Sequence, residues 1–346
     1  MTQRKLIIIS ACALISVLMV LGLYAYTSRQ NHYGNGFIRL YPPHVLSGTK
    51  ELNLGSDSHY ICGLNKSNIY LGNFDNPKEF IVVDKNLTTF KSQTLAIPGG
   101  MFIQKSSAIL KADSPNLYLI DGINDNLLRW QLNSLQLLEV HKLISNTLAL
   151  PISSGSIVMR LYNNQARQSY LIKYSYDSLA PTAKLQLQKQ VDGFFCSDGE
   201  LHYSKPLSSL VYVYFFRNQF ICMDTNLNIQ SYGKTIDTNT KAKIKVAAIR
   251  NNTYTLSSPP MYVNNTACVD GELLFINSRL KATNESKEQF NQASVIDIYS
   301  LKAGLYKYSL YVPDFNGKKI TNFKVDDRHL FVVQGKYVSV FQLNLP

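Results

Sequence analysis

A phrase that returns at nearly regular intervals limits what this chain can fold into. "EFIVVDKNL" ends at Leu87 and "QFICMDTNL" ends at Leu227, and both read as an apolar strand followed by a polar turn. Related phrases, "LLRWQLNSL" and "YLIKYSYDSL", end at Leu135 and Leu179, so the four leucines are spaced by 48, 44 and 48 residues. A looser version, "SVIDIYSLKAG", follows later in the chain. Each phrase comes after another apolar strand, so the repeating unit is built from strands.

A period of this length, with four strands in each period, is the size of a β-propeller blade. Blade 1 divides into "HYICGL", "NIYLGNF", "FIVVD" and "TTFKSQTL", which we name strands A to D from the inside outwards. Blade 2 divides into "AILKA", "NLYLIDG", "LLRWQL" and "LLEVHKL". The last pair, "HLFVVQ" and "YVSVFQL", lacks a D strand because the sequence ends shortly afterwards. The spare strand "GFIRLYP", residues 36–42, is predicted to supply it and close the ring.

We therefore predict an all-β fold, a single six-bladed β-propeller over residues 36–346. A seven-bladed ring is the alternative, for two reasons. The stretch "VDGFFCSDGELHYSKP" holds one short strand too many, and residues 235–258 form an unusually long connection. The repeat spacing and strand pattern resemble the broad class of membrane-tethered, poorly characterised bacterial propellers. No WD, kelch or Asp-box signature accompanies that resemblance.

The N-terminus has a different composition. Residues 6–26, "LIIISACALISVLMVLGLYAY", carry no charge and are long enough for an uncleaved transmembrane helix. Arg4 and Lys5 precede this segment and Arg29 follows it, which favours a cytoplasmic N-terminus. We therefore expect a cytoplasmic tail at residues 1–5, a linker at residues 27–35, and a propeller in the periplasm or outside the cell. A cleaved signal peptide is the alternative.

The charge of the chain suggests what it binds. Lys and Arg number 35 against 23 Asp and Glu, and all of the basic residues except Arg4 and Lys5 follow residue 26. This excess favours an acidic protein or glycan, or anionic lipid. Nucleic acid is not an expected partner in that compartment.

No catalytic motif stands out, and we expect no cofactor and no metal. HExxH, GxSxG, P-loop and GxGxxG patterns are absent, and the six histidines are scattered. The loop "DGINDN", residues 121–126, groups possible calcium ligands but also has turn composition. Cys62, Cys196, Cys222 and Cys268 are predicted to be buried free thiols. Cys62, Cys196 and Cys268 occupy related positions in separate blades, too far apart for disulfides, and Cys196 with Cys222 is the only pair within one predicted blade.

The candidate binding residues are basic and occur in loops. In a four-stranded blade the A–B and C–D turns lie on one face of the disc, and the B–C loops and D–A connections lie on the other. We name the second the B–C/D–A face. The predicted site on it comprises Lys241, Lys243, Lys245, Arg250, Arg279, Lys281, Lys287, Arg167 and Arg217. With residues 36–42 as the closing strand, the tether should leave from the opposite face, so that the B–C/D–A face points away from the membrane.

The leading functional hypothesis is thus a non-enzymatic binding or scaffold module, held at a membrane and facing outwards. The alternatives are a lactonase-like or glycan-processing enzyme with its site in the central channel, or a structural subunit of an envelope complex. The enzyme would need carboxylates on the innermost strands.

Overall fold

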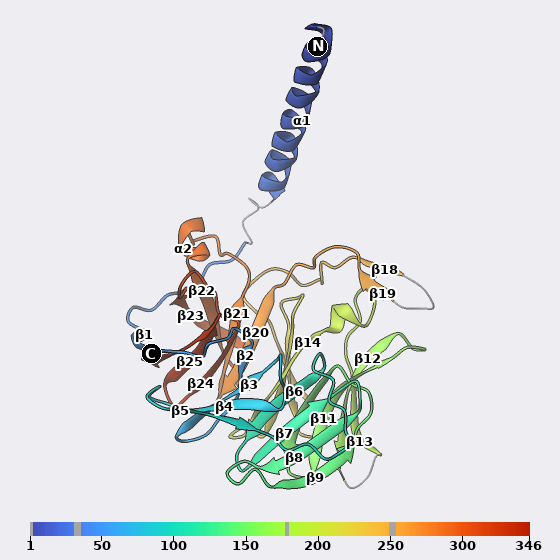
Figure 1. Cartoon of the computed structure of the whole chain (residues 1–346), viewed down its shortest axis with the longest axis vertical. Helices are drawn as coiled ribbons and strands as arrows, with labels where there is room; N and C mark the ends of the chain where they lie inside the picture. The colour runs from blue at the N-terminus through green and yellow to red at the C-terminus, as the bar shows by residue number, and fades with distance from the viewer. Residues whose placement is uncertain (1–2, 31–35, 177–179, 249–253) are drawn as a thin grey trace.

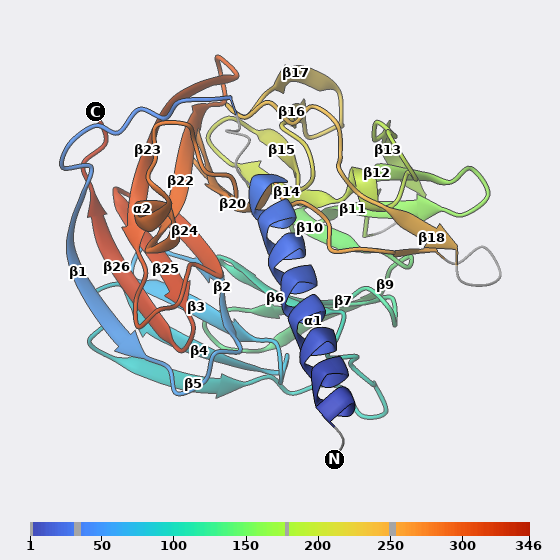
Figure 2. The same ribbon diagram turned by 90° about the horizontal axis from the view of Figure 1, so that it is seen from above.

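The protein is described by a computed structural model that covers residues 3–30, 36–176, 180–248 and 254–346. Within the first segment, the side chains of residues 7, 8 and 10–24 are described. Six four-stranded antiparallel sheets surround a central axis (Figures 1 and 2). The six-bladed prediction is confirmed.

The strands follow one another from the inside of each blade outwards. Blade 1 contains β2 (His59–Leu64), β3 (Asn68–Asn73), β4 (Glu79–Asp84) and β5 (Phe90–Thr94). Blade 2 contains β6 (Ala108–Asp113), β7 (Asn116–Asp121), β8 (Asn126–Gln131) and β9 (Leu137–Lys142). Blade 3 contains β10 (Leu148–Ser153), β11 (Ser156–Asn163), β12 (Gln168–Ser175) and β13 (Pro181–Gln186). Blade 4 contains β14 (Gly199–Ser204), β15 (Ser209–Tyr214), β16 (Phe220–Asp224) and β17 (Ile229–Gly233). Blade 5 contains β20 (Asn264–Asp270), β21 (Leu273–Ser278), β22 (Ala293–Ser300) and β23 (Leu305–Pro313). Blade 6 contains β24 (Asn322–Asp326), β25 (His329–Gln334), β26 (Tyr337–Leu343) and β1 (Leu46–Asn53).

The two irregular stretches do not form a seventh blade. The extra strand expected before blade 4 is a single 3-10 turn, Phe195–Ser197. In the described residues of the long connection after blade 4, the strands are β18 (Val246–Ala248) and β19 (Tyr254–Leu256), which pair with each other and not with a blade. The seven-bladed alternative is therefore wrong.

The apolar core lies between neighbouring blades. The middle strands are buried on both faces, as β15 shows along its whole length, whereas outer strands such as β5 are mostly exposed. Adjacent blades approach closely near the axis. A side chain on Gly63 would place its Cβ 1.9 Å from the carbonyl oxygen of Ala112 in blade 2, so this contact requires glycine.

The ring is closed by an N-terminal strand, but not by the predicted one. β1 pairs antiparallel with β26, from Leu46 opposite Leu343 to Asn53 opposite Tyr337. Residues 36–42 form no strand. They lie instead against blade 5, where the Thr283 N–H donates to the Phe37 carbonyl (2.8 Å) and the Ser309 N–H to the Leu40 carbonyl (2.8 Å).

A buried ion pair holds this N-terminal segment in place. The Arg39 Nε donates to Asp297 Oδ1 (2.7 Å) and its Nη1 to Glu285 Oε2 (2.7 Å). The Arg39 and Glu285 side chains have no exposed surface. Because Glu285 belongs to the B–C loop of blade 5, the chain reaches the propeller on the B–C/D–A face. The expectation that it arrives on the opposite face is therefore wrong. After Arg39 the chain passes outside β23 to reach β1 (Figure 2).

The N-terminal residues form α1 (Gln3–Gln30), which stands apart from the propeller (Figure 1). In the described part of the chain, no helix meets the combined requirements of length and apolarity for crossing a membrane. The predicted transmembrane helix at residues 6–26 is therefore not supported.

Candidate functional site

The predicted basic residues lie in the loops of one face. Arg167 and Arg217 follow β11 and β15, in the B–C loops of blades 3 and 4. Arg279, Lys281 and Lys287 lie in the B–C loop of blade 5, which contains the short helix α2 (Lys287–Asn291). Lys241, Lys243 and Lys245 lie in the connection between blades 4 and 5, near β18. Arg250 lies outside the described residues. The topology thus gathers the other eight on the B–C/D–A face.

The three lysines of that connection form the best-defined basic feature, which we name the lysine ridge (Lys241, Lys243 and Lys245). All three side chains are exposed, whereas the intervening Ala242 and Ile244 are buried.

Packing and hydrogen bonds anchor the ridge. Ala242 and Ile244 pack in a cluster with Cys196 and Phe216. The Ala242 N–H donates to Gln190 Oε1 (2.8 Å), and Gln190 Nε2 donates to the Thr240 carbonyl (2.9 Å). The lysines are therefore presented by an ordered segment.

Two of the predicted residues support the loops instead of facing solvent. The Arg217 side chain is fully buried; its Nη1 donates to the Gln188 carbonyl (3.1 Å) and its guanidinium lies 3.6 Å from the centre of the Tyr214 ring. The Lys281 Nζ donates to the carbonyl of Glu285 (2.8 Å). The Arg217 guanidinium is therefore held inside the protein, and the Lys281 ammonium is bonded to its own loop.

The remaining predicted cations are exposed. The Arg279 Nη2 donates to Asn265 Oδ1 (3.0 Å), which fixes its direction. The Arg167 guanidinium lies 5.4 Å from the centre of the Tyr254 ring, so the loops of blades 3 and 4 meet beside the lysine ridge. Lys287 is exposed at the start of α2.

The central channel holds a second group of charged side chains, which the sequence interpretation missed. Lys111 comes from β6, Glu200 and His202 from β14, and Lys324 from β24, all innermost strands. All four side chains are only partly buried, so solvent reaches them. The signal in the sequence was a charged residue inside a short innermost strand, as in "AILKAD", "GELHYS" and "NFKVD".

Glu200 has a structural task in this group. Its Oε2 accepts hydrogen bonds from the Ala267 N–H (2.7 Å) and the Thr266 hydroxyl (3.3 Å) of β20. The same oxygen lies 3.3 Å from His202 Nε2. The carboxylate thereby satisfies backbone polarity at the inner edge of blade 5, where no further strand can pair.

Burial and charge shift the pKa values of these groups. The pKa of Lys111 is lowered to about 8, chiefly by burial and also by the charge of Lys324, while Glu200 partly opposes both. Burial also lowers the pKa of His202, despite its contact with Glu200, so the imidazole is neutral at pH 7. Burial raises the pKa of Glu200, but His202, the Ala267 N–H and the charge of Lys324 together outweigh it, so that the pKa is lowered.

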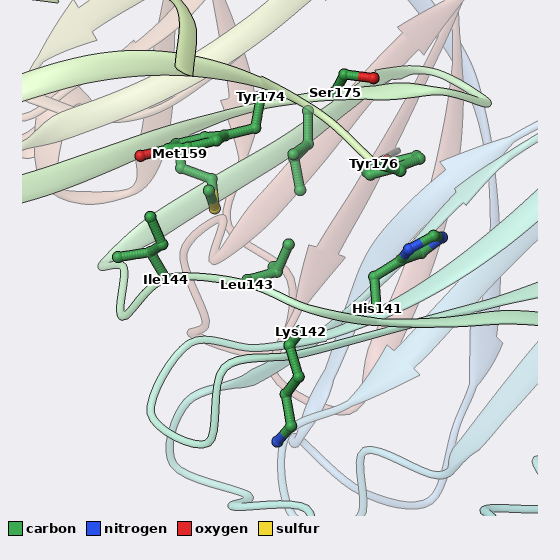
Figure 3. A pocket seen from close by; sticks show the side chains of 9 residues that line it. His141, Lys142, Leu143, Ile144, Met159, Tyr174, Ser175 and Tyr176 are labelled. Atoms are coloured by element: carbon green, nitrogen blue, oxygen red, sulfur yellow. The ribbon is translucent and has the colours of Figure 1, made fainter. Parts of the chain in front are cut away.

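A third feature is the small pocket between blades 2 and 3 shown in Figure 3. The His141 ring stacks on Tyr176 at 4.9 Å, and His141 Nε2 lies 2.8 Å from Glu139 Oε2. The pocket has a volume of about 10 Å³ and is lined mainly by Leu, Ile, Met and Tyr. Ligand pockets are far larger, ~300–1,000 Å³, so we interpret this one as a packing gap between blades.

Two other predictions concern metal ligands and thiols. Asp121 of the "DGINDN" loop accepts hydrogen bonds from the Gln104 N–H (2.7 Å) and the Ser107 hydroxyl (2.5 Å), and so organises the adjoining connection. Among the described residues, no three His, Cys, Asp or Glu side chains are grouped as metal ligands.

Cys62, Cys196, Cys222 and Cys268 are buried and free, as predicted.

Comparison with known proteins supports the fold. No protein-family model and no curated protein matches the sequence. Among solved structures, a putative exported protein of Bacteroides fragilis NCTC 9343 is similar with a TM-score of 0.55 and 11% identity, covering 89% of this chain and 98% of that one. A member of the DUF4221 family from Bacteroides vulgatus has a TM-score of 0.54 and 12% identity, covering 87% and 97%. At these identities the likeness shows the fold alone: the chain is a six-bladed β-propeller.

Proposed function

We propose that this propeller is a non-enzymatic binding module whose B–C/D–A face captures an acidic protein or glycan. The lysine ridge carries the proposal. Three cations project from one anchored segment, and Arg167, Arg279 and Lys287 extend the positive surface over blades 3 to 5. Loops on a rigid scaffold commonly carry binding residues. Charge gathered on one face raises the association rate with partners of opposite charge.

We further propose that α1 attaches the module to a membrane, with the propeller outside the cytoplasm. The supporting observation is its uncovered apolar surface. Nine large apolar side chains are 55–69% exposed: Ile7, Ile8, Leu14, Ile15, Val17, Leu18, Met19, Val20 and Leu21. Soluble monomers rarely leave so much contiguous apolar surface in water. Arg4 and Lys5, at the start of α1, favour a cytoplasmic N-terminus.

Charge reversal of the lysine ridge tests the binding function. We expect K241E/K243E/K245E to lose at least about tenfold in affinity for an immobilised acidic polymer such as heparin or polyglutamate, because repulsion replaces attraction. The loss should shrink as salt is raised, since exposed charges are screened. The melting temperature should stay close to that of the wild type, because all three side chains are exposed.

The matched control is K66E/K91E/K307E. These three lysines are also exposed, and they lie in the A–B turn of blade 1 and near the starts of β5 and β23, towards the other face. The control has the same net charge as the ridge variant. Equal loss of affinity in both triple variants would mean that only overall charge matters, and would contradict a site on the B–C/D–A face.

A further inference from the structure

The charged group in the channel is placed by the architecture. Lys111, His202 and Lys324 each stand two residues before the end of an innermost strand, in blades 2, 4 and 6, so they occupy the same level around the axis. All three side chains are partly exposed. The charge on Lys111 interacts with Lys324, with Glu200 of blade 4 and with Cys62 of blade 1. A side chain on one blade can be near three others, including blades that are not its neighbours, only at the central axis. Lys111 therefore extends into the channel, and Lys324 and Glu200 face the same space.

The charges there do not balance. Lys111 is mostly protonated at pH 7, because its pKa is about 8, and Lys324 is a second basic side chain in the channel. Neither lysine makes an ion pair with a described residue. Glu200 is the carboxylate whose charge interacts with Lys111, and its Oε2 already accepts hydrogen bonds from Thr266 and Ala267 of β20. His202 is neutral, and burial raises the pKa of the Cys62 thiol to about 12, so neither supplies negative charge.

Two neighbouring cations in a partly desolvated site raise the free energy of the empty protein. An anion between them would remove that cost and gain two charge-assisted hydrogen bonds. His202 Nε2 lies 3.3 Å from Glu200 Oε2 but makes no hydrogen bond of good geometry with a described residue, so it can still contact an anion beside the lysines.

We propose that the channel binds a small oxyanion, a phosphate or carboxylate group, held between Lys111 and Lys324 with His202 beside it. This site is separate from the lysine ridge and does not depend on the function proposed for it.

The two ends of the channel favour entry from one side. The B–C/D–A face carries the exposed basic residues. At the opposite end, Asp270 closes β20 near Asp326 and Asp327, and burial together with these two carboxylates raises the pKa of Asp270 to about 6. Negative charge at that end repels an anion, so we expect the ligand to enter through the basic face.

Calorimetric titration of the full chain with inorganic phosphate, and separately with acetate, tests the proposal. The wild type should bind at least one of them near pH 7, and Lys111→Met or Lys324→Met should each weaken binding at least about tenfold. Affinity should fall as pH rises above about 8, because Lys111 then loses the proton that the bound anion stabilises. Phosphate and acetate distinguish the two oxyanion classes.

The control variant K66M/K91M removes two exposed lysines outside the channel and should bind as the wild type does. Lys111→Gln keeps a polar side chain and serves as a second variant if methionine disturbs the fold. Binding that is unchanged in K111M/K324M, or no binding of either anion by the wild type up to roughly 10 mM, would overturn the proposal.

Discussion

At the residue scale, the repeated leucine of the sequence phrase has an unusual backbone. Leu87, Leu135 and Leu227 adopt the left-handed conformation, with φ of 55°, 55° and 62°. This region is unfavourable for a residue with a side chain, by ~1–2 kcal/mol. Burial of the leucines offsets the cost, since Leu87 and Leu227 are 8% and 4% exposed. The phrase therefore recurs in blades 1 and 4 because both C–D turns bury a leucine in this conformation. Leu135 is partly buried, and Leu179 lies outside the described residues.

An aspartate completes the turn in two blades. The Asp84 carboxylate accepts from the Thr88 N–H (2.8 Å) and the Asn86 N–H (3.1 Å), and Asp224 accepts from Asn226 and Asn228 in the same way. Burial raises the pKa of Asp84, but hydrogen bonds from the N–H and hydroxyl groups of Thr88 and Thr89 outweigh it, and the pKa falls to about 2. The pKa of Asp224 is also lowered, chiefly by its hydrogen bond with Asn228.

Replacing both aspartates tests this role. We expect D84A/D224A to lower the free energy of unfolding at pH 7 by about 1–3 kcal/mol, because two side chains that accept hydrogen bonds in the turns are lost. A carboxylate with a lowered pKa stabilises the fold above its unfolded-state pKa, and this contribution disappears as pH falls from about 4 to about 2. Denaturant unfolding at several pH values should therefore show that the free energies of unfolding of the variant and the wild type become equal in acid. If the difference between these two free energies stayed constant with pH, the proposed role of the aspartates would be contradicted.

The residue scale also shows where prediction from sequence stops. Asp297 stands in the apolar strand "SVIDIYS", which indicates a buried charge with a partner. That partner is Arg39, 258 residues earlier in the chain, and no local pattern links the two. Likewise, Lys111 and Lys324 become neighbours only when the ring closes.

At the element scale, the strand pattern predicted the inner and middle strands and the outer strands of blades 1 and 2, but it chose the wrong residues for the outer strand of blade 6. The inner strands must pack against neighbouring blades, so they carry apolar residues. Outer strands face solvent, and β1, "LSGTKELN", has mostly exposed side chains. The apolar segment at residues 36–42 therefore fitted the strand pattern better than β1 as the outer strand of blade 6. In the structure this segment packs on blade 5 through Arg39.

A truncation series separates the roles of the N-terminal elements. Removing residues 1–30 should release the protein from membranes without changing its melting temperature, because α1 stands apart. Removing residues 1–45 should also lower stability by about 3–5 kcal/mol, since Asp297 and Glu285 lose Arg39. Removing residues 1–53 should expose the edge of β26 and cause association.

Membrane fractionation, thermal melting and light scattering check the three steps. A 1–30 deletion that still sediments with carbonate-washed membranes would contradict attachment through α1. A monomeric 1–53 deletion with the wild-type melting temperature would contradict closure of the ring by β1.

At the scale of the whole molecule, the position of the N-terminal segment revises the expected orientation. Arg39 enters beside Glu285, in the same B–C loop as Arg279 and Lys287. The basic loops and the start of the propeller therefore share one face. The proposed partner must consequently bind on the side of the disc from which α1 extends.

Hydrogen–deuterium exchange of the full chain, with and without polyglutamate, tests the binding account most directly. We predict slower exchange in residues 238–248 and 279–292, because these segments carry the lysine ridge, Arg279 and Lys287. The A–B and C–D turns, including those at Leu87 and Leu227, should be unaffected. Protection of those turns, with unchanged exchange around the lysine ridge, would contradict a binding site on the B–C/D–A face.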